Sequence, residues 1–315
     1  MAKNNSLNNA RNIKNDEFYT LYEDIERELK HYKDHFKNKI IYCDCDNPKY
    51  SNFWKYFFIN FKDFGLKKLI STYYSKKYSV CKTEYDGVNT KIETLSHNGD
   101  FRNKECIDLL KKSDIVITNP PFSIWSDFVN IVIDNDKDFI IVGNKNAIIS
   151  KKLFILFMKN KIKYGFNNIS NFMTKNGDIQ KFGNVCWFTN LHISKKMNGL
   201  DLNKRYDEEF YQKYDNFDAI NIDRLKDIPY DYDGIMGVPI TFLEKYNSEQ
   251  FEILGLNGIG LDEEMSVKPI NEEWLIDYFK QGNKGHYTTK MRNLVLYENG
   301  MAKVKYKRVL IKRRK

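Results

Sequence analysis

The residues in this chain best suited to chemistry lie in a short loop that follows a β-branched run. Residues 115–118 have the side chains typical of a buried strand, and Asn119, Pro120, Pro121 and Phe122 follow at once. Proline cannot donate to a sheet ladder and disfavours helix in the residue before it, so the chain should leave the strand in a stiff, extended loop. The carboxyl edge of an open α/β sheet, where this loop would lie, is where such sheets bind their ligands.

Two oxygen acceptors and one aromatic face would stand together in this loop. Asn119 offers a side-chain carbonyl, Pro120 a main-chain carbonyl and Phe122 a flat ring. The set suits a planar ring with an exocyclic amino group, because accepting both amino hydrogens localises the nitrogen lone pair. That nitrogen can then attack an electrophilic methyl group. Taken alone, Asn-Pro-Pro can also be a rigid corner between a strand and a loop. The choice between that corner and a site for an amino group depends on the rest of the chain.

Length, charge and cysteine content limit the class of protein. A chain of 315 residues can hold one large α/β domain, or a domain of roughly 200 residues and a smaller one. The formal charge of +9 favours a polyanionic partner. No apolar run approaches the ~18 residues of a membrane span and the Asn-rich start has no apolar signal core, so we expect a cytoplasmic protein with no membrane partner. Cys43 and Cys45 lack a second pair, and no metal site is predicted.

Strands alternate with helices over the first ~190 residues, which predicts a mostly parallel sheet. An apolar face at helical spacing predicts the first helix, with Thr20 as its N-cap; that face consists of Tyr22, Ile25, Leu29, Tyr32 and Phe36. A β-ribbon is expected on either side of Asp86-Gly87. The other predicted strands cover 39–43, 68–73, 115–118, 139–142, 165–174 and 182–189.

An acidic loop, residues 44–52, follows the first predicted strand and leads into a helix. A helix N-terminus with loop amides can receive a ligand, but no glycine-rich fingerprint is present and a dinucleotide site is disfavoured. Carboxylates at the strand tip argue against phosphate and fit a ligand that carries an ammonium group or hydroxyls. The alternative is that Asp46, Asn47 and Ser51 only form the turn and cap the helix.

Beyond Leu191 the chain is polar, aromatic and poorly periodic, and it ends in a basic segment. Eight of the thirteen residues in 303–315 are basic and none is acidic. We expect a strand with one positive face, although a solvated tail is the alternative. The residues expected to contact phosphates are Lys284, Lys290, Arg292, Lys305, Lys307 and Arg308.

The order of these motifs resembles that of the EcoRI-like adenine-specific DNA methyltransferases. The segments that carry the resemblance are 15–20, 42–48, 51–53, 119–122, 187–191, 236–243 and 251–255. The resemblance implies an α/β fold, a Rossmann-like class I methyltransferase with a mostly parallel seven-stranded sheet and one antiparallel strand. It also implies a disordered N-terminus at 1–14, a catalytic domain at 15–192, and a target-recognition, DNA-binding region at 193–315.

The same resemblance implies S-adenosylmethionine as the cofactor and Asn119, Pro120, Pro121 and Phe122 as the catalytic residues. The residues that would border or hold the cofactor are Phe18, Tyr19, Thr20, Asp44, Asn47, Ser51, Asp100 and Phe101. Asp44, Asn47 and Ser51 would take its methionine end, and Asp100 with Phe101 its adenine. The chain departs from the broader superfamily because it lacks the glycine-rich first motif and has no acidic residue after the second strand.

The implied function is site-specific methylation of N6 of an adenine flipped out of duplex DNA. It implies an enzyme that belongs to, or derives from, a restriction–modification system in a prokaryotic cell or a phage-infected host. Whether a cognate restriction endonuclease acts separately beside it stays open. The alternatives are methylation of RNA adenine or of a protein glutamine, and a DNA-binding relative that has lost catalysis.

Overall fold

The computed structural model describes residues 18–174, 176–192, 199–257, 259 and 267–314. The chain divides into two compact units, each of which is described by itself. The first runs to Ile148 and resumes over Lys159–Ser194. The second consists of Ile149–Met158 and the chain from Lys195 onward.

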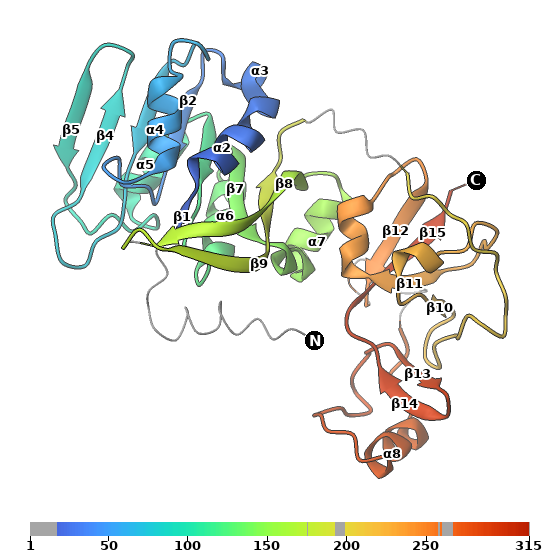
Figure 1. The fold of residues 1–315 in the computed structure, drawn as a ribbon. Coiled ribbons are helices and arrows are strands. Elements are labelled where there is room, and N and C mark those ends of the chain that lie inside the picture. Colours follow the sequence, from blue (N-terminus) through green and yellow to red (C-terminus); the bar gives the residue numbers. More distant parts are fainter. Residues whose placement is uncertain (1–17, 175, 193–198, 258, 260–266, 315) are drawn as a thin grey trace. The chain divides into compact units, whose positions relative to one another are not determined.

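The first unit is built around one nine-stranded sheet (Figure 1). Its strands follow the order β1-β8-β9-β7-β6-β2-β3-β4-β5. Their bounds are β1 Phe18–Thr20, β2 Ile40–Cys43, β3 Lys68–Ser71, β4 Cys81–Tyr85, β5 Thr90–Thr94, β6 Ile115–Thr118, β7 Asp138–Asn144, β8 Lys163–Thr174 and β9 Ile179–Thr189.

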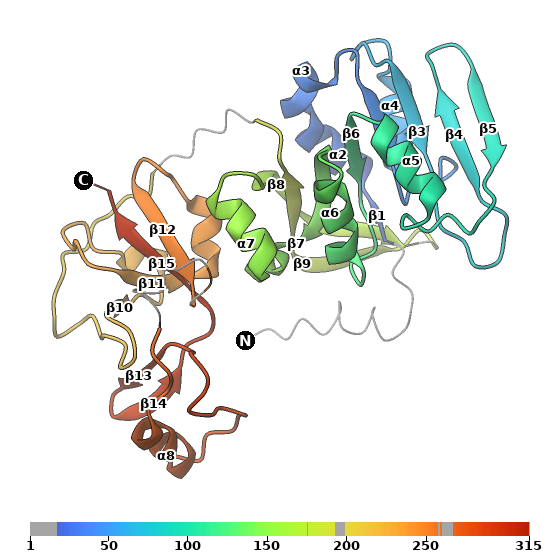
Figure 2. The same ribbon diagram turned by 180° about the vertical axis from the view of Figure 1, so that it is seen from behind.

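Helices cover both faces of this sheet. Figure 1 shows α2 and α4 on one face, and Figure 2 shows α5 and α6 on the other. The helices are α2 Tyr22–Leu29, α3 Lys33–Phe36, α4 Asn52–Ile59, α5 Lys104–Lys112 and α6 Trp125–Asp134, with short 3₁₀ turns η1 Lys30–Tyr32 and η2 Lys145–Ile149. Because both faces are covered, every residue of β6 is buried, as a continuous β-branched strand requires.

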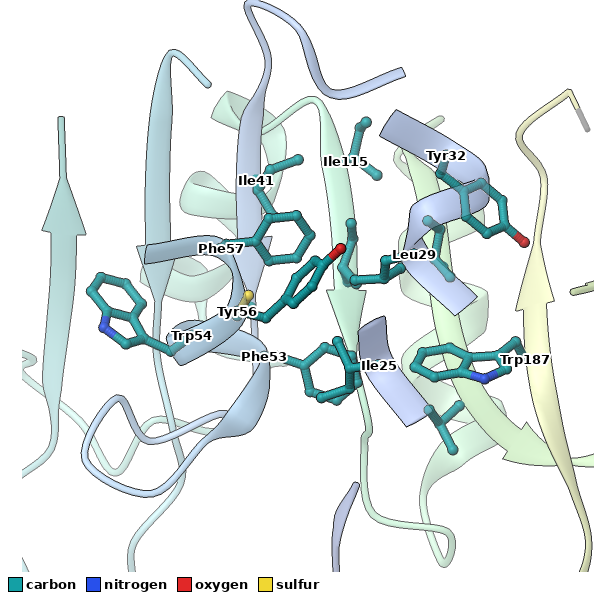
Figure 3. Close-up of a cluster of buried hydrophobic side chains, with 14 of the residues drawn as sticks. Ile25, Leu29, Tyr32, Ile41, Phe53, Trp54, Tyr56, Phe57, Ile115 and Trp187 are labelled. Atoms are coloured by element: carbon teal, nitrogen blue, oxygen red, sulfur yellow. The ribbon is translucent and has the colours of Figure 1, made fainter. Parts of the chain in front are cut away.

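The main core lies between the sheet and the layer formed by α2 and α4 (Figure 3). The apolar face predicted for the first helix is confirmed, because Ile25, Leu29, Tyr32 and Phe36 are fully buried. Phe53 and Phe57 of α4 pack into the same cluster, next to Ile41 of β2.

The sheet differs from the expected one in strand number and in direction. Only β3, β2, β6 and β7 are neighbours that pair in parallel. The strand β8 runs in the direction of this parallel set, whereas β9, β1 and β4 run against it. The prediction of seven strands with one antiparallel member was therefore wrong, because the ribbon β4–β5 and the short strand β1 extend the sheet at its two edges.

Thr20 belongs to β1 and does not cap the helix, so that prediction was also wrong. The residue before α2 is Leu21, and it makes no side-chain capping bond. The segment Phe18–Thr20 pairs instead with β8, in the register Phe18 with Thr174 and Thr20 with Phe172. The part of the predicted motif that precedes Phe18 lies outside the described residues.

A buried glutamate fixes the position of α2 on the sheet. Glu28 is fully buried, and its two oxygens accept hydrogen bonds from Tyr32, from the main-chain amides of Phe166 and Asn167, and from the Asn167 side chain. A Cβ atom at Gly165 would lie 2.2 Å from Glu28 Oε1, so only glycine fits there. The carboxylate therefore joins the helix to the irregular part of β8.

The second unit holds a four-stranded sheet in the order β10-β11-β15-β12, with a separate hairpin β13–β14. The bounds are β10 Ile220–Asn221, β11 Met236–Pro239, β12 Phe251–Leu256, β13 Val295–Glu298, β14 Met301–Val304 and β15 Arg308–Arg313; the helices are α7 Lys151–Met158 and α8 Glu272–Lys280, with 3₁₀ turns η3 Leu225–Asp227 and η4 Ile240–Lys245. Trp274 and Tyr278 of α8 pack on Val295 and Ala302 of the hairpin. This packing gives the segment between β12 and β15 a small core of its own.

The basic C-terminal segment does form strands, but its last strand is internal. β15 lies between β11 and β12, and Val309, Leu310 and Ile311 are fully buried. No helix in the described part of either unit is long and apolar enough to cross a membrane.

Candidate functional site

The loops that follow β2, β3 and β6 meet at one edge of the sheet, because these strands are parallel and adjacent. The main-chain amide of Asp46, after β2, donates to the carbonyl of Thr72, after β3, over 2.9 Å. The Thr118 hydroxyl, at the end of β6, lies 2.7 Å from Asp46 Oδ2 and also contacts the main-chain oxygen of Asp44. The acidic loop and the Asn-Pro-Pro-Phe loop therefore form one site.

The Asn119 side chain is held by β1. Its Nδ2 atom donates to the main-chain carbonyl of Phe18 over 2.7 Å. Its Oδ1 atom is buried and has no hydrogen-bond partner within the described residues. A buried acceptor without a donor is costly, so such an atom is a feature that calls for an explanation. This oxygen is the acceptor that the sequence predicts for an amino group.

The rest of the loop consists of two prolines and the ring of Phe122. Pro120 is buried, and the carbonyl of Pro121 accepts from the Ile124 amide at the turn into α6. Phe122 is half-buried, and its ring lies at 89° to that of Phe172 and at 68° to that of Phe182. These contacts are edge-to-face, so neither ring stacks flat on Phe122.

Two buried carboxylates stand beside this loop. Asp46 accepts from Ser51 at Oδ1 and from Thr118 at Oδ2, each over 2.7 Å. Asp44 Oδ1 accepts from the Thr72 hydroxyl and from the Cys45 amide. The exposed fractions of Asp44 and Asp46 are only 4% and 7%. Cys45, between them, adopts a left-handed conformation with φ of 64°, which turns the loop sharply.

Burial raises the pKa of both carboxyl groups. Burial raises the pKa of Asp46 to about 7, against the lowering effect of its bonds from Thr118 and Ser51. It raises the pKa of Asp44 to about 6, and the nearby Asp100 carboxylate adds to that increase. The leading causes of both shifts are burial, hydrogen bonds and neighbouring carboxylates. The charged forms of both carboxyl groups are therefore disfavoured in the fold, and a positively charged ligand would stabilise them.

The other predicted cofactor residues differ in the hydrogen bonds that they already make. Ser51 caps α4 by accepting from the amides of Phe53 and Trp54, and Asn47 accepts from the Lys49 amide within the turn. These two residues therefore do form the turn and the helix cap, as the sequence allowed. Both oxygens of Asp100 bind Arg102, which lowers the pKa of Asp100.

Phe101 and Tyr19 are two further residues that the sequence predicts at the cofactor site. Phe101 is 4% exposed and packs edge-to-face on Phe128 of α6, so its ring belongs to the core of the unit. Tyr19 lies at the centre of β1, opposite Met173 of β8. An open pocket of about 390 Å³ lies beside the loops that follow β2 and β3, and Asn47, Pro48 and Tyr73 line it. Trp54 and Phe58 of α4 and residues of the ribbon β4–β5 form its other walls.

In the second unit, the six residues expected to contact phosphates differ in exposure and in ionic partners. Lys305 pairs with Asp223 and Glu298, and Arg308, which is 8% exposed, pairs with Asp223. Their charges are therefore already neutralised within the unit. Lys284, Lys290 and Arg292 are exposed on the segment between α8 and β13, where residues 278–297 contain no acidic residue. Lys307 is half-buried.

Sequence reasoning did not include Asp46, Thr118 or Asn52 among the named site residues. Asp46 joins the loops after β2 and β6, which are 72 residues apart. Asn52, the first residue of α4, donates from Nδ2 to the main-chain carbonyl of Thr20 over 2.9 Å. The only available signal was that Asp46 and Asn52 lie in the same polar loop as Asp44 and Ser51.

Comparison with known proteins gives one family. The family model described as adenine-specific methyltransferase EcoRI matches residues 6–314. The protein called Type II methyltransferase M.EcoRI, from Escherichia coli, is 43% identical over 300 residues, which cover 83% of this chain and 92% of that protein. Type II methyltransferase M.MpnI, from Mycoplasma pneumoniae, is 38% identical over 269 residues, which cover 79% of this chain and 84% of that protein. No solved structure matches significantly.

The raised pKa of Asp46 predicts how the free energy of unfolding depends on pH. The folded protein keeps this proton at pH values where the unfolded chain has lost it, so the free energy of unfolding should fall as pH rises from about 4 to about 7. Asp46→Asn keeps the hydrogen-bonding shape without the charge. Between pH 5 and pH 8, urea unfolding should show the variant gaining stability relative to the wild type, by on the order of 3 kcal/mol.

Asp63→Asn, the same substitution at an exposed position, is the control for that measurement. If wild type and Asp46→Asn keep a constant difference in stability from pH 5 to pH 8, the Asp46 carboxyl does not hold its proton in the fold.

Proposed function

The chain belongs to the EcoRI family of adenine-specific methyltransferases, and from this premise we propose how its own residues carry out the reaction. It is a DNA adenine methyltransferase. The reaction we propose is transfer of a methyl group from S-adenosylmethionine to N6 of an adenine that has left the stack of duplex DNA. The observation that carries this proposal is the buried, unpartnered Oδ1 atom of Asn119 beside two buried carboxyl groups.

Asn119 and Pro120 act on the amino group of the base. The Asn119 Oδ1 atom and the Pro120 carbonyl accept the two N6 hydrogens, which localises the lone pair on that nitrogen. The half-buried ring of Phe122 offers a surface for the purine. An adenine paired in the duplex uses its amino group in the base pair, so it has to be flipped out before these oxygens can reach it. No general base is required, because the methylated nitrogen is strongly acidic and loses its proton afterwards.

Asp44 and Asp46 fit a cofactor that carries positive charge. Each is buried without a cationic partner among the residues that shift its pKa, so an ammonium or sulfonium group would relieve an existing electrostatic cost. When bound, S-adenosylmethionine supplies an electrophilic methyl group on a sulfonium. Asp44 is the residue we assign to its methionine end, with the loop of Asn47 and Ser51. Phe18, Tyr19 and Thr20 border this site from β1, and we assign its adenine to the region of Asp100 and Phe101.

We assign the contacts with DNA to the second unit, and within it to the exposed segment between α8 and β13. Lys284, Lys290 and Arg292 are exposed there, in a stretch of sequence without acidic residues, so phosphates would be suitable ionic partners for them. Lys305 and Arg308 already hold carboxylates, and we assign them to the interior of the unit instead. A cognate restriction endonuclease, acting separately on the same DNA site, is the partner that a Type II system would add.

The proposal is tested by expressing the chain in a host that has no DNA methylation and mapping modified bases across its genome. We expect N6-methyladenine within one short recognition sequence. Asn119→Ala should lower transfer at least about 1,000-fold, because it removes an acceptor that acts on the reacting amine, and should bind S-adenosylmethionine as the wild type does. Assays with single-stranded RNA and with protein as acceptors separate the alternatives. Methylation of RNA or glutamine alone, or full activity of Asn119→Ala, would contradict the proposal.

The salt dependence of DNA binding tests the assignment of the phosphate contacts. Removing two contacts with Lys284→Ala and Lys290→Ala should reduce the slope of log K against log salt by about 2 in magnitude. Lys305→Ala is the matched control, since its ammonium is held by Asp223 and Glu298, and should leave the slope unchanged. The assignment is wrong if Lys305→Ala changes the slope and the double variant does not.

A further inference from the structure

Two asparagine side chains occupy the outer edge of strand β1. β1 is an edge strand of the sheet and pairs only with β8. In an antiparallel pair, alternate carbonyls point away from the partner strand, and on an edge strand they are left without a ladder partner. Here the carbonyl of Phe18 accepts from Asn119 over 2.7 Å, and that of Thr20 accepts from Asn52 over 2.9 Å. The start of α4 and the catalytic loop are both tied to β1 in this way.

The Phe18 carbonyl determines which way the Asn119 amide faces. A side-chain amide has a donor end and an acceptor end, and only the donor end can lie against a carbonyl oxygen. With Nδ2 fixed on Phe18, the Oδ1 atom is turned to the other side, where it is buried and unpartnered. If the amide were reversed, two oxygens would meet at the Phe18 carbonyl and a nitrogen donor would face the substrate amine.

We propose that the main-chain carbonyl of Phe18 is a positioning group for methyl transfer, and that Asn52 supports it by holding Thr20. This inference rests on the proposed role of Asn119 as the acceptor for N6. It explains why asparagine, and not aspartate, stands at position 119: an ionised carboxylate has no hydrogen to donate to Phe18. A protonated carboxyl group, by contrast, can donate to Phe18 through one oxygen and accept from the base with the other.

The pH dependence of kcat in the variant Asn119→Asp tests the role of the Phe18 carbonyl. The ratio of its kcat to that of the wild type, with DNA and cofactor saturating, should rise at least about tenfold between pH 8 and pH 6 as the introduced carboxyl takes up its proton. The other titratable groups on the elements around it are Asp44 and Asp46 after β2 and Tyr19 on β1. They are present in both proteins, so the ratio reports the change at position 119 together with its coupling to these groups.

Asn52→Ala tests the support of β1 without touching the catalytic loop. Losing the bond to Thr20 should lower kcat about tenfold and leave KM for DNA unchanged, because β1 then holds Asn119 less well. Asn60→Ala is the matched control: Asn60 Nδ2 also donates to a main-chain carbonyl, that of Tyr56, over 2.8 Å, at the other end of α4. Its kcat should equal that of the wild type.

A measurement that does not depend on activity separates this inference from the proposed function. In urea unfolding, the midpoint of Asn119→Asp relative to the wild type should be lower at pH 8 than at pH 6, because the ionised carboxylate opposes the Phe18 carbonyl. If that shift occurs and the wild type transfers no methyl group to DNA, the proposed function fails and the positioning contact stands. If the wild type methylates DNA while Asn119→Asp is fully active at pH 8, or Asn52→Ala keeps its kcat, the positioning role is overturned.

Discussion

The hydrogen bond between the Asn119 side chain and the Phe18 carbonyl is the contact on which the rest of the site depends. It uses the donor end of the amide and leaves the acceptor end buried without a partner. The bond requires a strand that is distant in sequence to lie beside the Asn-Pro-Pro-Phe loop, and this strand pairs with β8. Glu28, in turn, ties α2, which follows β1, to the irregular part of β8. The position of one amide oxygen therefore relies on a series of buried polar contacts through the first unit.

The charged side chains of the two units differ in whether they have partners of opposite charge. In the first, Asp44 and Asp46 are buried without a basic partner, which raises their pKa values and favours a cationic ligand. In the second, the carboxylates of Asp223 and Glu298 neutralise Lys305, and Asp223 also binds Arg308. The basic segment at 280–292 has no acidic residue in its own sequence.

Local patterns in the sequence predicted the local structure well. The apolar face of α2, the β-branched run of β6 and the Asp86-Gly87 hairpin all have short-range signals, and all three are confirmed. Features that depend on distant partners could not be predicted. β1 is three residues long and pairs with residues more than 150 positions away, so no periodicity reveals it. Lys305 and Asp223 are 82 residues apart, and the sequence alone showed only an unneutralised basic run.

The central claim is that Asn119 presents its oxygen, and not its nitrogen, to the amino group of a flipped adenine. The most direct measurement is a crystal structure of the protein with duplex DNA that contains its recognition sequence and with sinefungin, a non-reactive analogue of the cofactor. In that complex, Asn119 Oδ1 should lie about 2.9 Å from N6 while Nδ2 remains on the Phe18 carbonyl. A flipped adenine whose N6 contacts neither Asn119 nor Pro120, or an amide released from Phe18, would contradict it.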